Sequence, residues 1–230
     1  MNTALDWEID SLLDQIREDY RETAIYTGRT LPNERVMQAL HEVPRHLFVP
    51  TEQLPNAYFN QPLPIGHGQT ISQPYIVALM TDLIQPKADA VVLEVGTGSG
   101  YQAAILGQLV KQVYSVEIIE KLALLARERL HRLGYLNIEV MAGNGHLGWP
   151  EHAPYDAILV TAAAERIPAA LIAQLKPGGK LVIPIGGYLG GQSLMLVNKD
   201  ARGLIDTRNV LPVMFVPLVA EPESVGRCEP

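Results

Sequence analysis

Short apolar runs of strand length alternate with longer amphipathic stretches over the middle of the chain. The runs lie at residues 91–95, 113–117, 138–141, 157–161 and 180–185. Apolar residues recur at helical spacing within 101–109, 120–133 and 167–175. Strands that alternate with helices in this way form a parallel sheet covered on both faces. The pattern therefore predicts a doubly wound α/β fold.

The pattern changes after residue 185. A glycine-rich turn over 186–191 separates the fifth run from apolar residues at 194–196, and a turn at 200–203 precedes a last run at 210–218. No helical stretch stands between these runs, so a parallel crossover is excluded. We expect the last strands to be antiparallel to each other.

The first 50 residues are mainly helical in pattern. Apolar side chains at helical spacing predict an amphipathic first helix: Ile9, Leu12, Leu13, Ile16 and Tyr20. Asn33 is a plausible N-cap of a second helix, which ends before Pro44. We expect 45–50 to be extended and 58–64 to be irregular. Residues 1–50 are thus interpreted as a helical extension packed on the core.

The stretch 65–75, IGHGQTISQPY, combines two glycines with hydroxyl and amide side chains. It predicts a pliable loop that leads into a helix over 76–84. On local grounds Ser72 is an N-cap, because it stands just before Pro74 and an apolar-periodic run. Thr70 is equally consistent with a turn residue, and His67 with an exposed loop residue. Local sequence physics alone does not make this loop an active site.

The stretch 91–101, VVLEVGTGSGY, predicts a strand, a tight turn and the start of a helix. Gly96, Gly98 and Gly100 stand at every second position, where the missing Cβ allows a positive φ and close approach of a ligand to the main chain. Ligands bind at the carboxyl ends of parallel strands. A ligand is therefore expected here, although glycines needed only for turn geometry remain an alternative.

The spacing of the glycines favours a nucleoside without phosphates. The dinucleotide motif is G-x-G-x-x-G, whereas this chain has G-x-G-x-G followed by the bulky Tyr101. No Lys or Arg stands between Glu94 and Lys111 to meet a phosphate. Glu117 ends the next strand, about 20 positions on, where an acidic residue holds ribose hydroxyls. S-adenosylmethionine is the usual ligand of this type.

Composition excludes several classes of protein. The 230 residues carry a net charge of -7 with scattered basic residues, which argues against a nucleic-acid partner. No apolar run reaches the 18 residues of a membrane span, and the acidic amino end lacks a signal-peptide core. Cys228 is the only cysteine and the six histidines have no metal-ligand spacing, so we expect no metal. A cytoplasmic protein is predicted, with a monomer favoured.

Several motifs together resemble the protein-L-isoaspartate O-methyltransferases. They are IGHGQTISQPY, LEVGTGSGYQAA, APYDAILVTAAA, LKPGGKLVIPIG and VMFVPL. The resemblance runs from about residue 36 to 218. It implies a Rossmann-like, doubly wound, mostly parallel seven-stranded sheet with an antiparallel terminal hairpin. It also implies a methyltransferase domain over 51–220, a substrate loop at 65–75 and a flexible tail at 221–230.

The resemblance further implies a reaction. The family transfers a methyl group from S-adenosylmethionine to the free α-carboxylate of L-isoaspartyl residues in damaged proteins, which starts their repair and leaves S-adenosylhomocysteine. Isoaspartyl proteins and peptides would be the partners. An α-carboxyl has a pKa near 3.5 and is ionised at neutral pH, so the reaction needs no general base.

Site residues follow from the same resemblance. Ser72 matches the active-site serine. The positions that match the cofactor site are Gln69, Thr70, Ile71, Glu94, Gly96, Thr97, Gly98, Gly100, Glu117, Asn144 and Gly145. The positions that match the peptide-binding segment are Val216 and Pro217.

One position departs from the family pattern. The family usually has Gly-Asp-Gly where this chain has Gly143, Asn144 and Gly145, and an amide accepts a hydrogen bond from adenine without charge assistance. Three alternatives stay open. They are a methyltransferase for another small acid or amine, a non-catalytic adenosyl-binding module, and a nicotinamide oxidoreductase.

Overall fold

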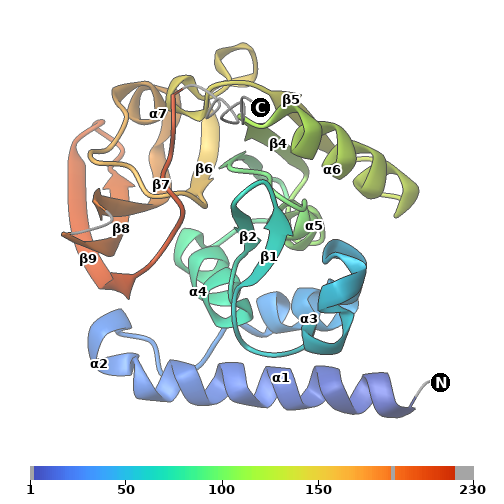
Figure 1. Ribbon diagram of the computed structural model, residues 1–230. Coiled ribbons are helices and arrows are strands. Elements are labelled where there is room, and N and C mark those ends of the chain that lie inside the picture. The colour runs from blue at the N-terminus through green and yellow to red at the C-terminus, as the bar shows by residue number, and fades with distance from the viewer. Residues whose placement is uncertain (1–2, 188–189, 221–230) are drawn as a thin grey trace.

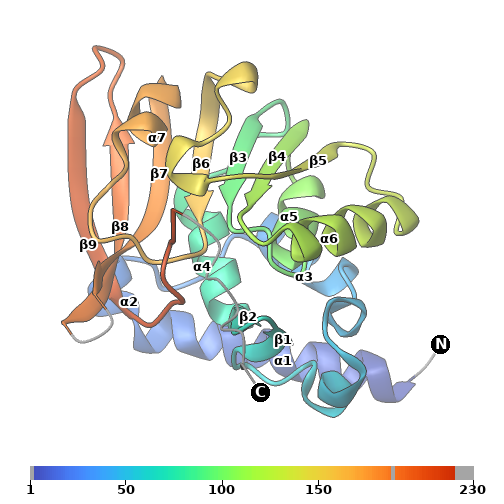
Figure 2. The same ribbon diagram turned by 45° about the horizontal axis from the view of Figure 1, so that its top comes forward.

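The computed structural model describes residues 3–187 and 190–220, and its centre is one twisted sheet (Figure 1, Figure 2). The strand order is β5-β4-β3-β6-β7-β8-β9. The strands are β3 (Val91–Val95), β4 (Gln112–Glu117), β5 (Ile138–Ala142), β6 (Tyr155–Val160), β7 (Leu175–Gly187), β8 (Gly191–Lys199) and β9 (Ile205–Val213). Pairing is parallel from β5 to β7 and antiparallel from β7 to β9. The predicted fold class is confirmed.

Helices cover the two faces of the sheet unequally. The α-helices are α1 (Thr3–Glu22), α2 (Ala24–Thr27), α3 (Glu34–Glu42), α4 (Pro74–Ile84), α5 (Tyr101–Gly107), α6 (Glu120–Arg132) and α7 (Ala169–Gln174). Buried side chains of α1, α3, α4 and α5 share one hydrophobic cluster with one face of the sheet, and α7 packs on the other face. Short 3₁₀ helices are η1 (Arg45–Phe48), η2 (Thr51–Asn56), η3 (Gly145–Leu147) and η4 (Pro150–His152).

The predicted amphipathic first helix is confirmed. In α1 the side chains of Ile16 and Tyr20 are fully buried, and the helix lies against α3 and α4 (Figure 2). The Asn33 side chain accepts a hydrogen bond from the Arg35 N–H at 2.9 Å, which confirms Asn33 as the N-cap of α3. The amino-terminal helices therefore share the core of the sheet rather than forming a separate one.

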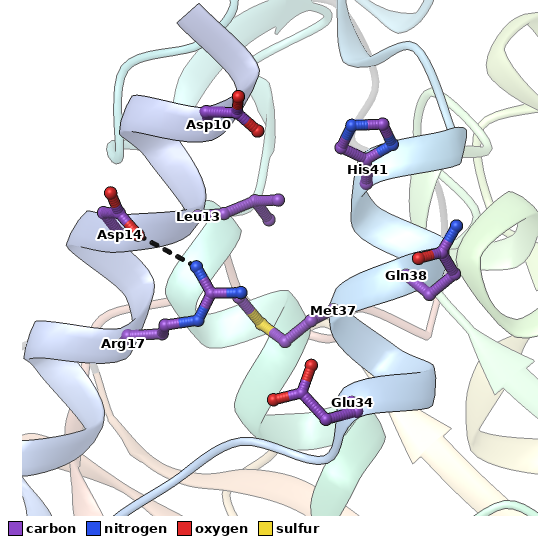
Figure 3. Close-up of a pocket in the computed structure, with 8 residues that line it drawn as sticks. All are labelled: Asp10, Leu13, Asp14, Arg17, Glu34, Met37, Gln38 and His41. Carbon is purple, nitrogen blue, oxygen red and sulfur yellow. Dashed lines mark hydrogen bonds and ion pairs between the residues drawn. The ribbon is translucent and has the colours of Figure 1, made fainter. Parts of the chain in front are cut away.

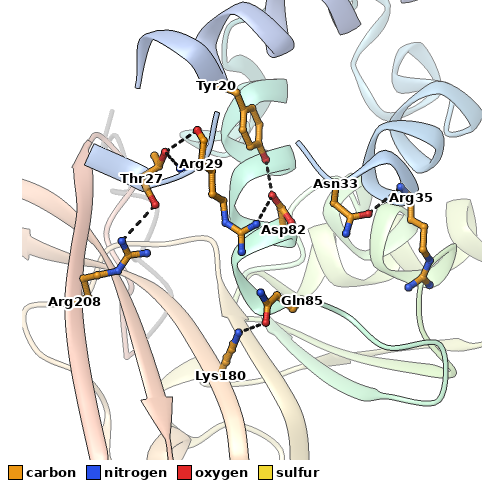
Figure 4. A network of polar contacts seen from close by, with 9 residues as sticks. All are labelled: Tyr20, Thr27, Arg29, Asn33, Arg35, Asp82, Gln85, Lys180 and Arg208. Carbon is orange, nitrogen blue, oxygen red and sulfur yellow. Dashed lines mark hydrogen bonds and ion pairs between the residues drawn. The ribbon is translucent and has the colours of Figure 1, made fainter. Parts of the chain in front are cut away.

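Polar contacts fix the chain between α1 and α3 to the core (Figure 4). Arg29 forms a 3.0 Å ion pair with the buried Asp82 of α4, and the Tyr20 hydroxyl donates to the same carboxylate at 3.5 Å. On the other side, Arg208 of β9 donates to the carbonyl oxygen of Thr27 at 3.3 Å. This segment is thus anchored to both α4 and the edge of the sheet.

A shallow pocket of about 350 Å³ lies between α1 and α3 (Figure 3). Its only ion pair among the described residues joins Arg17 to Asp14 at 2.9 Å on the same helix. Because the Asp14 side chain is largely exposed, this pair contributes little to stability. The pocket is a surface feature of the helix packing.

Two expectations for the segment before α4 are wrong. Residues 45–48 form the 3₁₀ helix η1 instead of extended chain, because the buried Arg45 guanidinium donates to the carbonyl oxygens of Ala57 and Gln61. The stretch 58–64 is not wholly irregular, since β1 (Leu63–Gly66) pairs with β2 (Gln69–Ile71). Neither outcome follows from local propensity: Arg45 bonds to carbonyl oxygens 12 and 16 residues later, and β1 forms only by pairing with β2 in a hairpin.

Strand bounds near the carboxyl end also differ from the prediction. β7 begins at Leu175, so residues 177–179 belong to a strand and do not simply end the helix. β9 ends at Val213, whereas the prediction extended it to 218. After Val213 the chain leaves the sheet and crosses to Ala163 at the end of β6. The tail 221–230, with Cys228, lies outside the described residues.

Within the described ranges, none of the helices combines the length and the apolarity that crossing a bilayer requires.

Candidate functional site

The glycine-rich turn joins β3 to α5 at the carboxyl edge of the sheet. Gly96, Gly98 and Gly100 have φ values of 98°, 53° and 87°, a region that L side chains rarely adopt. Thr161, directly after β6, donates through Oγ1 to the carbonyl oxygen of Gly96 at 2.6 Å. Glycine is therefore required for the conformation of this turn.

A cavity of about 690 Å³ opens above this turn, a size typical of small-molecule sites. It is lined by His67, Gly68, Gln69, Thr70, Val95, Gly96, Gly98, Val116, Glu117, Ile118, Ile119, Glu120, Gly145, Thr161, Ala162, Val216, Pro217, Leu218 and Val219. The lining combines bare main chain, aliphatic side chains and the carboxylate of Glu117. We call this space the cofactor cavity.

Glu117 ends β4 and faces the glycine turn. Its Oε2 accepts from the Gly98 N–H at 2.8 Å, and its Oε1 accepts from the Ile119 N–H at 3.0 Å. A carboxylate has about four acceptor positions, so two remain for hydroxyl groups of a ligand. The predicted acidic residue is thus held rigidly at the edge of the cavity.

Glu94 lies below the turn and is absent from the lining of the cavity. Its Oε2 accepts from the Ser115 hydroxyl, and Ser115 Oγ lies 2.5 Å from Thr97 Oγ1. Among the described residues Oε1 has no hydrogen-bond partner. Complete burial raises the pKa of Glu94 to about 8, and the hydrogen bond from Ser115 opposes that shift. Glu94 acts on the turn through Ser115 and Thr97 rather than by facing the cavity.

The stretch predicted as a pliable loop is a hairpin over the cavity. Strands β1 and β2 are joined at His67 and Gly68, and Gln69 and Thr70 line the cavity. Ile65 of the same hairpin lies so close to the glycine turn that a Cβ on Gly98 would be 3.4 Å from its Cδ1. Ile71 is buried in the core and outside the cavity lining. The hairpin therefore lies directly over the glycine turn.

Ser72 lines a second cavity of about 580 Å³, which we call the substrate groove. It is lined by Asp19, Thr23, Pro62, Thr70, Ser72, Gln73, Tyr75, Ile76, Thr161, Leu211, Pro212, Val213, Met214, Phe215 and Val216. The N-cap of α4 is Gln73, so the local interpretation of Ser72 as an N-cap is wrong. Because Pro74 occupies the first turn of α4, the cap falls one residue later, which leaves Ser72 at the groove.

Residues 215–218 form a strap across the end of β6. Gln192 of β8 holds Phe215 with two hydrogen bonds, of 2.6 Å to its N–H and 3.0 Å to its carbonyl oxygen. Farther along, Ala163 donates to the Val216 carbonyl oxygen at 2.8 Å. Val216 lines both cavities, while Pro217 lines the cofactor cavity. The strap is the wall that the two spaces share.

Asn144 and Gly145 follow β5. The Asn144 Oδ1 accepts from the His146 N–H at 2.9 Å and caps η3. Gly145 lines the cavity, and a Cβ there would be 2.4 Å from Cγ1 of Val95. The chain can pass this point only with glycine.

Two further residues of the site were not predicted from the sequence. Thr161 lines both cavities, and Gln192 positions the strap. Thr161 had a detectable signal, because it is a polar residue directly after a strand of the parallel sheet. Gln192 had none, since its role depends on the course of the chain 23 residues later.

Comparison with known proteins identifies the family. A family model described as protein-L-isoaspartate(D-aspartate) O-methyltransferase matches residues 23–223. The chain belongs to this family. A relative from Polaromonas sp. (strain JS666), named protein-L-isoaspartate O-methyltransferase 2, is 59% identical over 210 residues, which cover 91% of this chain and all of the relative. One from Syntrophobacter fumaroxidans with the same name is 58% identical, covering 90% of this chain and 84% of its own length.

Solved structures of the protein-L-isoaspartate methyltransferase family have the same fold. One named protein-L-isoaspartate O-methyltransferase superposes with a TM-score of 0.79 at 27% identity, over 91% of this chain and 67% of its own. One from Plasmodium falciparum, in complex with S-adenosyl-L-homocysteine, has a TM-score of 0.77 at 26% identity and covers 92% of this chain and 98% of its own. The predicted family, enzyme class and S-adenosylmethionine dependence are confirmed.

Proposed function

We propose that the chain transfers a methyl group from S-adenosylmethionine to the free α-carboxylate of L-isoaspartyl residues in proteins, and so starts their repair. The observation that carries this proposal is the meeting of two cavities. Thr70, Thr161 and Val216 line both the cofactor cavity and the substrate groove. The two spaces are therefore adjacent, so a cofactor in one and a substrate in the other would lie on either side of these three residues.

The cofactor cavity suits an adenosyl group. Glu117 would accept from the ribose hydroxyls, and the main chain at Gly96 and Gly98 would lie under the ribose and the methionine part. Gly145 would leave room for the adenine ring beside Val95. When bound, S-adenosylmethionine supplies a methyl group on a positively charged sulfur.

The chemistry at the groove requires desolvation and alignment more than proton transfer. An isoaspartyl α-carboxylate is already ionised at neutral pH, with a pKa near 3.5. One of its oxygens bonds to the methyl carbon as the carbon–sulfur bond breaks, so the two charges cancel and no proton moves. The protein must therefore exclude water from the carboxylate and hold it in line.

Ser72 has the role of a positioning donor in this scheme. Its hydroxyl would donate to the carboxylate and so orient it toward the shared wall at Thr161. The hairpin above Gly98 would exclude water from the same point. Glu94, Ser115 and Thr97 would stiffen the turn from below. Cytoplasmic location, monomeric state and a lack of nucleic-acid or membrane partners stay predictions from the sequence.

The test is methyl transfer from radiolabelled S-adenosylmethionine to an isoaspartyl peptide beside its aspartyl twin. The proposal expects label in base-labile ester on the isoaspartyl peptide alone. Label on both peptides, or only on an unrelated small acid or amine, would instead indicate a methyltransferase of another specificity. Cofactor binding without any transfer would indicate an adenosyl-binding module.

A further inference from the structure

Helix α1 forms one wall of the substrate groove and is tied to the helix that follows Ser72. Thr23 Oγ1 lies 2.5 Å from the Tyr75 hydroxyl. Asn60 donates to Asp19 Oδ2 at 2.7 Å and accepts from the Tyr75 N–H at 3.0 Å. These three hydrogen bonds fix the carboxyl end of α1 and the residue after it to the start of α4, and they place Asp19 at the groove.

Asp19 is the only charged side chain among the described residues that line the groove. Hydroxyl, amide and apolar groups make up the rest, including the largely exposed Met214. No Lys, Arg or His nitrogen of the described residues lies within 4.0 Å of the Asp19 carboxylate. The groove therefore presents one negative charge without a partner cation of its own.

The surroundings partly withdraw this carboxylate from water. Burial raises the pKa of Asp19, the hydrogen bond from Asn60 opposes that effect, and the neighbouring Glu18 raises the pKa further. A carboxylate partly withdrawn from water interacts more strongly with other charges, because the local dielectric constant is lower. A second carboxylate would be repelled from this end of the groove, and a cation would be attracted.

Asp19 stands outside the range that the family model matches. The family model begins to match at residue 23, directly after α1 ends at Glu22. Asp19 thus belongs to an element that precedes the matched range, while Ser72 and Thr161 lie inside it. The family match therefore assigns no role to Asp19.

We propose that Asp19 makes the enzyme select isoaspartyl sites that have a basic side chain nearby in the polypeptide. This inference rests on the proposed function and adds a sequence preference to it. The isoaspartyl carboxylate would occupy the end near Ser72 and Thr161, away from Asp19. A lysine or arginine of the substrate would then pair with Asp19, and a glutamate in its place would be repelled.

The test uses isoaspartyl hexapeptides that differ only in one residue, which is Lys, Gln or Glu. This residue is placed in turn at four positions, which are the two before and the two after the isoaspartyl residue. The measured quantity is kcat/KM for the full chain and for Asp19→Asn, which keeps an acceptor for Asn60. Asp6→Asn is the matched control, because Asp6 is an exposed carboxylate 13 residues earlier on the same helix.

For the natural chain we expect the Lys peptide to exceed the Glu peptide by about tenfold in kcat/KM at one or more positions, the size of one partly buried charge interaction. In Asp19→Asn the kcat/KM values of the Lys and Glu peptides should differ by less than about twofold. Salt at about 0.5 M should have the same effect on the natural chain, because it screens the charge. Asp6→Asn should leave the ratio as it is. Calorimetric titration with S-adenosylhomocysteine checks that Asp19→Asn is folded.

Two results would overturn the inference. One is equal use of the Lys and Glu peptides by the natural chain at all four positions, and the other is a preference that survives in Asp19→Asn. Both leave the proposed function intact, because isoaspartyl peptides are still methylated. Failure of the proposed function is a different result, in which no isoaspartyl peptide is methylated at all.

Discussion

Thr161 Oγ1 donates to the carbonyl oxygen of Gly96 at 2.6 Å, and a Cβ atom added to Gly96 would lie 2.3 Å from that same Oγ1. Thr161, at the end of β6, thus holds the turn after β3 by a hydrogen bond. The same side chain leaves no room at position 96 for any residue but glycine. Thr161 also lines both cavities. One hydroxyl therefore connects the shape of the cofactor cavity to the shared wall.

Gly96→Ala should weaken cofactor binding by more than about tenfold, because the turn must shift away from Thr161 and the positive φ adds strain of about 1 kcal/mol. Calorimetric titration with S-adenosylhomocysteine measures the effect. Gly134→Ala is the control, since Gly134 also has a positive φ but nothing lies within 4 Å of its added Cβ. The double variant with Thr161→Ala should regain part of the affinity. Equal losses for Gly96→Ala and Gly134→Ala would show that strain alone is responsible.

Ser72→Ala should lower kcat by about 10- to 100-fold, the effect of losing a hydrogen bond to a charged group of about 1.5–3 kcal/mol. Cofactor affinity should change by less than about twofold, because Ser72 lines the groove and not the cofactor cavity. Steady-state kinetics and calorimetry separate the two quantities. A loss of affinity as large as the loss of rate would refute the assignment.

Glu117→Gln should act first on cofactor binding. The amide oxygen can accept from only one of the two N–H groups now bound by the carboxylate, at Gly98 and Ile119, and it lacks the charge that strengthens bonds to ribose hydroxyls. We expect Kd to rise by about 10- to 100-fold, measured by calorimetry. Glu120→Gln is the control, because Glu120 lines the same cavity but is exposed. Similar losses in both variants would point to the overall charge of the cavity instead.

Asn144→Asp should tighten cofactor binding by about three- to tenfold. The Asn144 oxygen is already used by the His146 N–H, so the second position on this side chain is an NH₂ donor. An aspartate would keep the cap and offer a second acceptor to the adenine amino group. Calorimetric titration with S-adenosylhomocysteine, and with the inosine analogue that lacks this amino group, measures the effect. The gain should be absent with the analogue.

The parallel half of the sheet could be predicted because β3, β4 and β6 are mostly buried apolar runs, and such runs are visible in the sequence. Glu117 could be predicted for the same reason, since it directly ends such a run. The strap was missed because residues 215–218 are as apolar as a strand, and hydrogen bonds to Gln192, Ala163 and His146 hold them away from the sheet. The hairpin over the cavity was missed because its pairing partner lies in a proline-rich stretch.

Burial of Glu94 should make the stability of the protein depend on pH. Its pKa is about 8 in the folded chain and about 4.3 in an unfolded one. Between these values the unfolded chain releases the proton and the folded chain keeps it. The stabilisation of the folded chain by the proton on Glu94 is therefore fully present below about pH 4. It is lost as pH rises toward 8, by up to about 1.4 kcal/mol of unfolding free energy per pH unit.

Glu94→Gln should remove this slope, because the amide has no proton to release and its oxygen still accepts from Ser115. The free energy of unfolding, measured with urea at pH 5.5 and 7.5, should fall by about 2 kcal/mol more in the natural chain than in the variant. Glu128→Gln, which changes an exposed residue of α6, should leave the natural slope in place. If Glu94→Gln keeps the full slope as well, Glu94 is ionised throughout this range and the turn rests on a buried negative charge.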